Sequence, residues 1–177
     1  MHRIVFAFPA LEQHLRAVRS TPQSYRPDAC GHCGSACLWC HGCYHRKADR
    51  SDDGLLNPVP VLRFRCSTCR RTCSRLPLCL CPRRWYDWTV QQQVLLLLLI
   101  GASLRRTAAV LGLSYYTVRR WWRWLQMHGV TFAFHLRSRF AGLGRATDTR
   151  ALWLACFDRM PLCEAMAWLD HDGQDVP

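Results

Sequence analysis

The stretch Leu104–Arg123, LRRTAAVLGLSYYTVRRWWR, matches a helix-turn-helix at the positions where that motif restricts the residue type. Ala108 is small at the point where the two helices meet, and a larger side chain there would push them apart. Gly112 falls in the turn, where a left-handed backbone conformation penalises residues with a Cβ atom. The remaining inward positions hold Thr107, Leu111, Leu113, Val118 and Trp121. The pattern therefore predicts two helices packed across a tight turn.

The flanking sequence predicts that this pair of helices belongs to a longer helical segment. The run VLLLLLI (94–100) is far shorter than the ~20 residues needed to span a bilayer, so we expect a buried helix and no membrane insertion. The stretch 147–169 predicts two further short helices. The predicted helix signals are a capping box at Thr89 and Gln92, N-caps at Ser103 and Ser114, and a stop at Gly129 after a helix that ends near His128.

Positive charge is concentrated in the middle of the chain. The formal net charge is +12, yet between Gly54 and Thr147 the only acidic residue is Asp87. A folded surface so poor in anions suits a polyanionic partner such as double-stranded DNA. The fifteen arginines of this stretch are residues 63, 65, 70, 71, 75, 83, 84, 105, 106, 119, 120, 123, 137, 139 and 145.

Two C-x2-C motifs predict a metal site. They are Cys30-Gly-His-Cys33 and Cys66-Ser-Thr-Cys69, and VPVLRFRC (59–66) alternates like a strand that leads into the second. Two such knuckles supply the four thiolates of a tetrahedral Zn2+ site. Because four ligands leave no open coordination position, we expect a structural zinc in a zinc ribbon.

Eight further cysteines permit other interpretations. Cys37, Cys40 and Cys43, with His41 and His45 nearby, could form a second zinc site, to which Cys73, Cys79 and Cys81 could also contribute. The interpretation that we favour is that these are small buried thiols acting as hydrophobic residues, as also expected for Cys156 and Cys163. Twelve cysteines without a convincing secretory signal predict reduced thiols and a cytoplasmic location.

The second helix of the motif would enter the major groove of DNA. Arg119 or Arg120 could bind guanine with two hydrogen bonds. Trp124 could contact nucleic acid or pack on the C-terminal helices. The expected groove residues are Ser114, Tyr115, Tyr116, Thr117, Arg119 and Arg120, of which the hydroxyls of Ser114, Tyr115 and Thr117 suit phosphates. The residues expected to neutralise the DNA backbone are Arg105, Arg106 and Arg123.

The order of these motifs resembles the zinc-ribbon and helix-turn-helix proteins associated with bacterial insertion sequences. The resemblance covers roughly residues 28–128 and includes HGCYHRKA (41–48), RFRCSTCRRTCSRLP (63–77) and CPRRWY (81–86). The family commonly follows the second knuckle with Arg-Thr-Phe-Ser and Leu-Pro. Cys73 stands here in the aromatic position, which argues against a ligand role for it.

The expected fold class is small α+β, in which a four-cysteine zinc ribbon precedes an all-α helix-turn-helix domain with short C-terminal helices. The N-terminal segment suggests an amphipathic helix around Leu11, Leu15 and Val18. The predicted boundaries are 1–25 for an N-terminal helical segment, 26–84 for the ribbon, 85–130 for the helix-turn-helix and 131–177 for a helical tail.

The resemblance implies a DNA-binding protein of a mobile element: an accessory factor, a regulator or the remnant of a transposase. A transposase nuclease core binds two divalent ions with carboxylates on a mixed sheet, and the acidic residues after the motif lie on helical or frayed segments. We therefore expect no enzymatic activity. One alternative is the DNA-binding subunit of a split transposase, working with a separate catalytic subunit. Another is a zinc-dependent module that binds RNA or protein.

Overall fold

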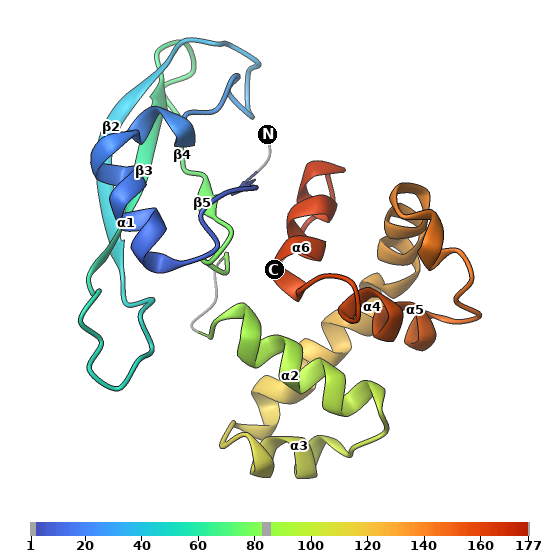
Figure 1. Cartoon of the computed structure of the whole chain (residues 1–177). Helices are drawn as coiled ribbons and strands as arrows, with labels where there is room; N and C mark the ends of the chain where they lie inside the picture. Colours follow the sequence, from blue (N-terminus) through green and yellow to red (C-terminus); the bar gives the residue numbers. More distant parts are fainter. Residues whose placement is uncertain (1–2, 83–85, 177) are drawn as a thin grey trace. The chain divides into compact units, whose positions relative to one another are not determined.

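A computed structural model describes residues 3–82 and 86–176 of the chain (Figure 1). They form two compact units, one of residues 1–87 with 175–177 and one of residues 88–174. The sheets lie in the first unit, and the described part of the second unit is helical, so the expected α+β class is confirmed. Two arginines of the basic stretch, Arg83 and Arg84, lie outside the described residues together with Trp85.

The first unit is built on a β-hairpin. Strands β2 (Leu38–Arg46) and β3 (Val59–Cys66) pair antiparallel, and β4 (Thr72–Cys73) extends the sheet on the other side of β3. Strand β3 coincides with the predicted strand, whereas β2 was missed. The other elements are β1 (Ile4–Val5), which pairs in parallel with β5 (Leu76–Pro77), the helix α1 (Leu11–Ser20) and the 3-10 turn η1 (Pro22–Tyr25).

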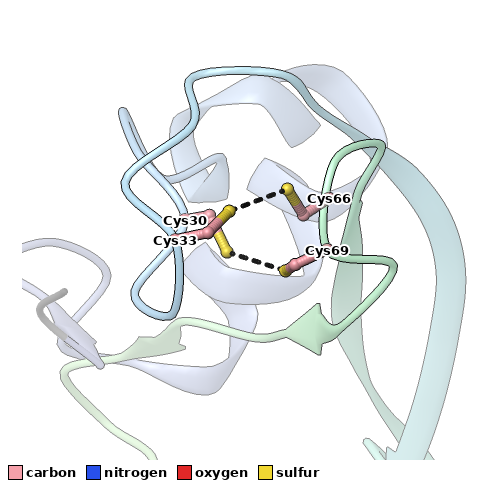
Figure 2. Close-up of side chains that lie close together, drawn as sticks. All are labelled: Cys30, Cys33, Cys66 and Cys69. Atoms are coloured by element: carbon pink, nitrogen blue, oxygen red, sulfur yellow. Dashed lines mark hydrogen bonds between the residues drawn. The ribbon is translucent and has the colours of Figure 1, made fainter.

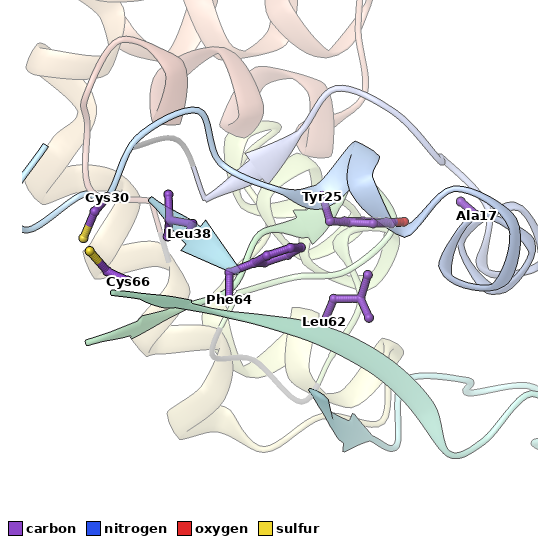
Figure 3. Packing of buried hydrophobic residues seen from close by; sticks show 7 residues of the cluster. All are labelled: Ala17, Tyr25, Cys30, Leu38, Leu62, Phe64 and Cys66. Atoms are coloured by element: carbon purple, nitrogen blue, oxygen red, sulfur yellow. The ribbon is translucent and has the colours of Figure 1, made fainter. Parts of the chain in front are cut away.

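Strand β3 separates two small apolar clusters because successive side chains point to opposite faces of a strand. On one face, Leu62 and Phe64 pack with Ala17 of α1 and with other buried residues (Figure 3). On the other face, Val59 and Val61 pack with residues that include Leu76 and Leu80. The expected N-terminal helix is thus present as α1, and it covers one face of the hairpin.

A buried histidine links α1 to the hairpin. His14 is only 1% exposed, and its Nε2 lies 2.8 Å from the carbonyl oxygen of Pro60. Since a carbonyl can only accept, Nε2 donates, and Nδ1 accepts from the Tyr25 hydroxyl at 2.6 Å. Burial lowers the pKa of His14, so the neutral ring is favoured. Nothing in the sequence pattern distinguishes this histidine.

The second unit contains the predicted helices and packs them around a larger core. The run 94–100 lies mainly in the first of these helices, where Val94, Leu95, Leu98 and Leu99 are buried as expected. No described helix is long and apolar enough to cross a membrane. The elements are α2 (Trp88–Leu99), α3 (Leu104–Val110), α4 (Tyr115–Arg139), η2 (Ala141–Leu143), α5 (Thr149–Phe157) and α6 (Leu162–His171).

The predicted stop at Gly129 is wrong, because α4 continues to Arg139. Gly129 is buried inside the helix, and a Cβ atom there would lie 3.0 Å from the Cγ2 atom of Thr149. The glycine therefore serves close packing against the first residue of α5. The last turn of α4 is tied to α6 by the ion pair of Arg139 and Asp172, whose atoms are 2.6 Å apart.

The predicted capping box is also wrong. Helix α2 begins at Trp88, so Thr89 lies within its first turn. The side-chain oxygen of Gln92 instead accepts a hydrogen bond from the backbone amide of Leu162 at 2.7 Å. This amide is the first of α6, which has no side-chain cap of its own. Gln92 fits the local capping-box pattern, but its side chain joins α2 to α6, which is distant in the sequence.

Candidate functional site

The four cysteines of the two C-x2-C motifs come together at one end of the hairpin (Figure 2). Their sulfur atoms all lie within 4.8 Å of one another. The closest pairs join the two motifs, with 3.6 Å between the sulfurs of Cys30 and Cys69 and 3.6 Å between those of Cys33 and Cys66. The predicted ligands thus form a four-thiol group that could hold a metal ion.

Both motifs have the same backbone hydrogen bonds. In the first knuckle, the amide of Gly34 donates to the carbonyl of Cys30 at 2.9 Å, and the amide of Cys30 donates to the carbonyl of Ser35 at 2.8 Å. In the second knuckle, the amide of Arg70 donates to the carbonyl of Cys66 at 3.0 Å, and the amide of Cys66 donates to the carbonyl of Arg71 at 3.0 Å. The two turns therefore present their thiols in the same way.

The residue after the second cysteine has a positive φ in each knuckle. It is Gly34 in the first, with φ +71°, and Arg70 in the second, with φ +61°. Glycine adopts this left-handed conformation freely, whereas a residue with a Cβ atom pays about 1–2 kcal/mol. The second knuckle thus keeps an arginine at a conformational cost, which the sequence did not indicate.

Backbone amides favour the thiolate form of two of the ligands. The amides of His32 and Cys33 lower the pKa of Cys30. The amide of Cys69, assisted by that of Thr68, lowers the pKa of Cys66 to about 6.

In Cys33, the amide of Ser35 also favours the thiolate, but desolvation and the neighbouring cysteines outweigh it, so the pKa rises to about 11. A bound cation would relieve this repulsion and favour thiolates at all four positions.

The remaining cysteines of the hairpin do not join this group. Cys37, Cys40 and Cys43 are exposed, so the interpretation of them as buried hydrophobic residues is wrong. Within residues 3–82 and 86–176, the only metal-ligating cluster found is that of the four knuckle cysteines. Cys81 and Cys156 are buried as expected, and the half-buried Cys73 packs against the cluster around Phe64.

The helix-turn-helix has the predicted geometry. Helices α3 and α4 are joined by a turn in which Gly112 has φ +63°. Ala108 is buried at the α3 side of the contact and Val118 at the α4 side. The hydroxyl of Ser103 caps α3 by accepting from the amide of Arg106 at 3.2 Å, as expected. Ser114 stands at the N-cap of α4, but its side chain makes no capping hydrogen bond.

The predicted DNA-contacting residues lie almost entirely on the surface. Tyr116 is 76% exposed and Tyr115 37%, whereas Thr117 is half-buried and less accessible than expected. Thr107 and Trp121 are buried beneath them, and Leu111 and Leu113 are half-buried. The other exposed members of the predicted set are Arg105, Arg106, Ser114, Arg119, Arg120 and Arg123.

An open groove of about 390 Å3 runs along the exposed side of α4. Three guanidinium groups border it beside two aromatic rings, and Met127 extends the groove beyond the predicted set. Among the described residues, none of these three arginines forms an ion pair with an acidic side chain. The lining residues are Tyr116, Arg119, Arg120, Arg123, Trp124 and Met127.

Trp124 both borders this groove and packs along its own helix. Its ring centroid lies 5.5 Å from that of Phe132 and 6.0 Å from that of His128. Phe132 in turn meets Trp153 of α5, with 6.4 Å between the ring centroids. Trp124 therefore packs on Phe132, which in turn contacts α5, and it also lines the groove.

A protein-family model, described as a domain of unknown function (DUF6431), matches residues 30–121. The match begins at Cys30, the first cysteine of the four-thiol group, and includes both knuckles, α3 and the first two turns of α4. Searches of curated proteins and of solved structures found no match.

Proposed function

We propose that this chain, which belongs to the DUF6431 family, is a non-enzymatic, sequence-specific DNA-binding protein with a structural zinc ion. The observation that carries the proposal is the exposed arginine row of α4, which stands on a packed helix-turn-helix and, among the described residues, forms no ion pair with an acidic side chain. Zinc would stabilise the first unit. DNA reading would belong to the second.

The thiol geometry supports zinc at the four cysteines. With Zn–S bonds of about 2.3 Å, the sulfur atoms of a tetrahedral site lie about 3.8 Å apart. The sulfur pairs of Cys30 with Cys69 and Cys33 with Cys66 are 3.6 Å apart, so small adjustments would complete the site. Four thiolates favour zinc over the hard cations calcium and magnesium, which prefer oxygen ligands.

The placement of the arginines supports major-groove binding. Val118, Trp121 and Leu125 anchor α4 in the core, and its opposite side stays free to enter a groove about 12 Å wide. Arg119, Arg120 and Arg123 lie on this exposed side, which suits base contacts near the start of the helix. Arg105 and Arg106 of α3 are exposed and suit phosphates.

The link to a mobile element rests on the resemblance to insertion-sequence proteins. The chain would act as an accessory factor, a regulator or a transposase remnant. As the DNA-binding subunit of a split transposase, it would work with a catalytic subunit encoded separately. A pull-down of such a subunit with the tagged chain distinguishes the split transposase from a stand-alone regulator.

Selection of preferred duplexes from a random pool, followed by binding of alanine variants, tests the proposal. We expect Arg119→Ala or Arg120→Ala to cost about 1–3 kcal/mol on the preferred duplex and to reduce discrimination against altered sites. Arg105→Ala and Arg106→Ala should weaken all duplexes about equally and lower the salt slope by roughly one unit.

The matched control is Arg150→Ala, since Arg150 is exposed on α5 of the same unit. This variant should retain the site preference. If Arg119→Ala and Arg120→Ala both leave the preference intact, the proposal for α4 is wrong. If double-stranded RNA binds in preference to every DNA duplex, and Arg119→Ala and Arg120→Ala weaken that binding, the chain is instead an RNA-binding module.

A further inference from the structure

A second cationic surface lies in the first unit, on the face of β3 opposite Leu62 and Phe64. It consists of Trp39 and His41 of β2 and Arg63 and Arg65 of β3, and we call it the ribbon face. Trp39 is paired across the strands with Arg65. The residues that alternate with these arginines along β3, namely Leu62, Phe64 and Cys66, point to the other face and are buried in the cluster that includes Ala17 of α1.

Each arginine of the ribbon face lies beside an aromatic ring. Trp39 is 48% exposed, and the Arg65 guanidinium carbon lies 6.0 Å from its ring centroid. The His41 ring is 5.2 Å from that of Trp39 at a steep angle. Arg63 lies 5.7 Å from the centroid of Tyr44 further along the hairpin. Contacts of this kind with aromatic rings hold the guanidinium groups of Arg63 and Arg65 in place.

The two strands of this surface carry only positive charge. Strands β2 and β3 contain no acidic residue. Arg70 and Arg71 of the second knuckle follow β3 and are also exposed. The indole ring of Trp39 offers a flat apolar surface beside these cations. An anionic partner with flat rings would use both features.

We propose that the ribbon face binds an unpaired nucleic-acid strand, with a base stacked on Trp39 and phosphates held by Arg63 and Arg65. In a duplex, the flat faces of the bases are stacked on one another, so Trp39 would find no ring to stack on. An unpaired strand offers both ring faces and phosphates, and aromatic residues in basic grooves bind such strands in a sequence-tolerant way. This site lies on a different unit from α4 and does not depend on the DNA reading proposed there.

Fluorescence anisotropy with labelled oligothymidylate, oligouridylate and a duplex lacking the preferred site tests the inference on the zinc-loaded full chain. Trp39→Ala should weaken binding of an unpaired strand about 5- to 100-fold, while Trp39→Phe should retain most of it. Arg63→Ala and Arg65→Ala should each reduce the slope of log affinity against log salt by about 0.7. The thymidylate and uridylate arms distinguish DNA from RNA as the source of the strand, and tight binding of either supports the proposal.

The charge-matched controls are Arg16→Ala and Arg19→Ala, because both arginines are exposed on α1 at the other face of the hairpin. They should leave the affinity for an unpaired strand nearly unchanged, as should Arg119→Ala in the second unit. Metal content and circular dichroism establish that each variant is folded. A folded Trp39→Ala variant with unchanged affinity for unpaired strands, or one that loses affinity for duplex and unpaired strands equally, would overturn the inference. Loss of duplex site preference in Arg119→Ala, with unchanged affinity for an unpaired strand, supports the assignment of the two activities to two separate surfaces.

Discussion

The two units of this chain are stabilised in different ways. The first has two small apolar clusters on the faces of one strand, and its four-thiol group lies at one end of that strand. The second buries large side chains of several helices, including Trp121, Phe132 and Trp153. We therefore expect the first unit to depend on the proposed zinc ion for its stability and the second unit not to depend on it.

This difference separates the two proposed activities. On the proposal above, the arginines of α4 stand on helices that need no metal, and the ribbon face stands on a hairpin that the two knuckles cross-link at one end. Loss of the metal should therefore affect one surface and spare the other. The following predictions test this separation, from the largest expected effect to the smallest.

The largest effect is expected from Cys66→Ser. Structural zinc contributes on the order of 10 kcal/mol to folding in small domains, so this variant should lose the metal and unfold the hairpin. Because most helices belong to the second unit, the far-ultraviolet helical signal should largely remain. Cys40→Ser is the control, since Cys40 is exposed and lies outside the four-thiol group. A metal content near two per chain in the wild type would show that the exposed cysteines of β2 form a second site.

A smaller effect, this time on the second unit and not on the first, is expected from Leu125→Ala. Leu125 is 2% exposed in the core of the second unit, and truncating a buried leucine costs about 2–5 kcal/mol. The helical signal should melt at lower denaturant concentration while the bound metal stays constant. Release of the metal in step with the helices would mean that the two units unfold as one.

The pH dependence of the first unit should include a contribution from His14. Burial lowers the pKa of His14 in the folded state, so its unfolded form binds a proton more readily. Its contribution to stability is therefore present above the ordinary pKa of about 6.5 and decreases as the pH falls below it. Denaturation of the zinc-loaded protein between pH 7.5 and 5.5, compared with His14→Gln, separates this contribution from protonation of the thiolates. Equal pH dependence in both proteins would exclude His14 as the cause.

The smallest effect, and a stabilising one, is expected from Arg70→Gly. The positive φ of Arg70 should be adopted with less strain by glycine, as Gly34 does in the first knuckle. The free energy of unfolding of the first unit should rise by up to about 1 kcal/mol. Gly34→Arg is the reciprocal variant and should lower it. A destabilised Arg70→Gly protein would mean that the Arg70 side chain makes a contact worth more than the strain.

The fold was predictable where residue spacing determines geometry. The knuckle cysteines and the turn at Gly112 were identified because metal coordination and a left-handed turn leave few alternatives. Strand β2 was missed, because Cys40, His41 and Cys43 suggested ligands or core thiols and hid the strand pattern. In the structure, Gly42 has φ +74° at a bulge opposite β3, which interrupts the alternation of the strand further.

Errors arose where a local signal was outweighed by tertiary packing. Gly129 resembled a helix stop, yet its missing side chain makes room for Thr149. Gln92 resembled a capping partner for its own helix but caps α6. The cluster of four cysteines and the exposure of the α4 arginines were predictable from the sequence. The ribbon face required the pairing of Trp39 with Arg65, which only the fold supplies.

The most direct test of the central claim is the duplex site preference of the metal-free protein. After removal of zinc with a chelator, binding of the full chain to its preferred duplex and to a single-base variant is measured at one salt concentration. The account predicts that discrimination between the two duplexes persists, because α3 and α4 stay folded, while affinity for oligothymidylate falls. Loss of discrimination together with the metal, with the helical signal unchanged, would contradict the claim that the helix-turn-helix reads DNA on its own.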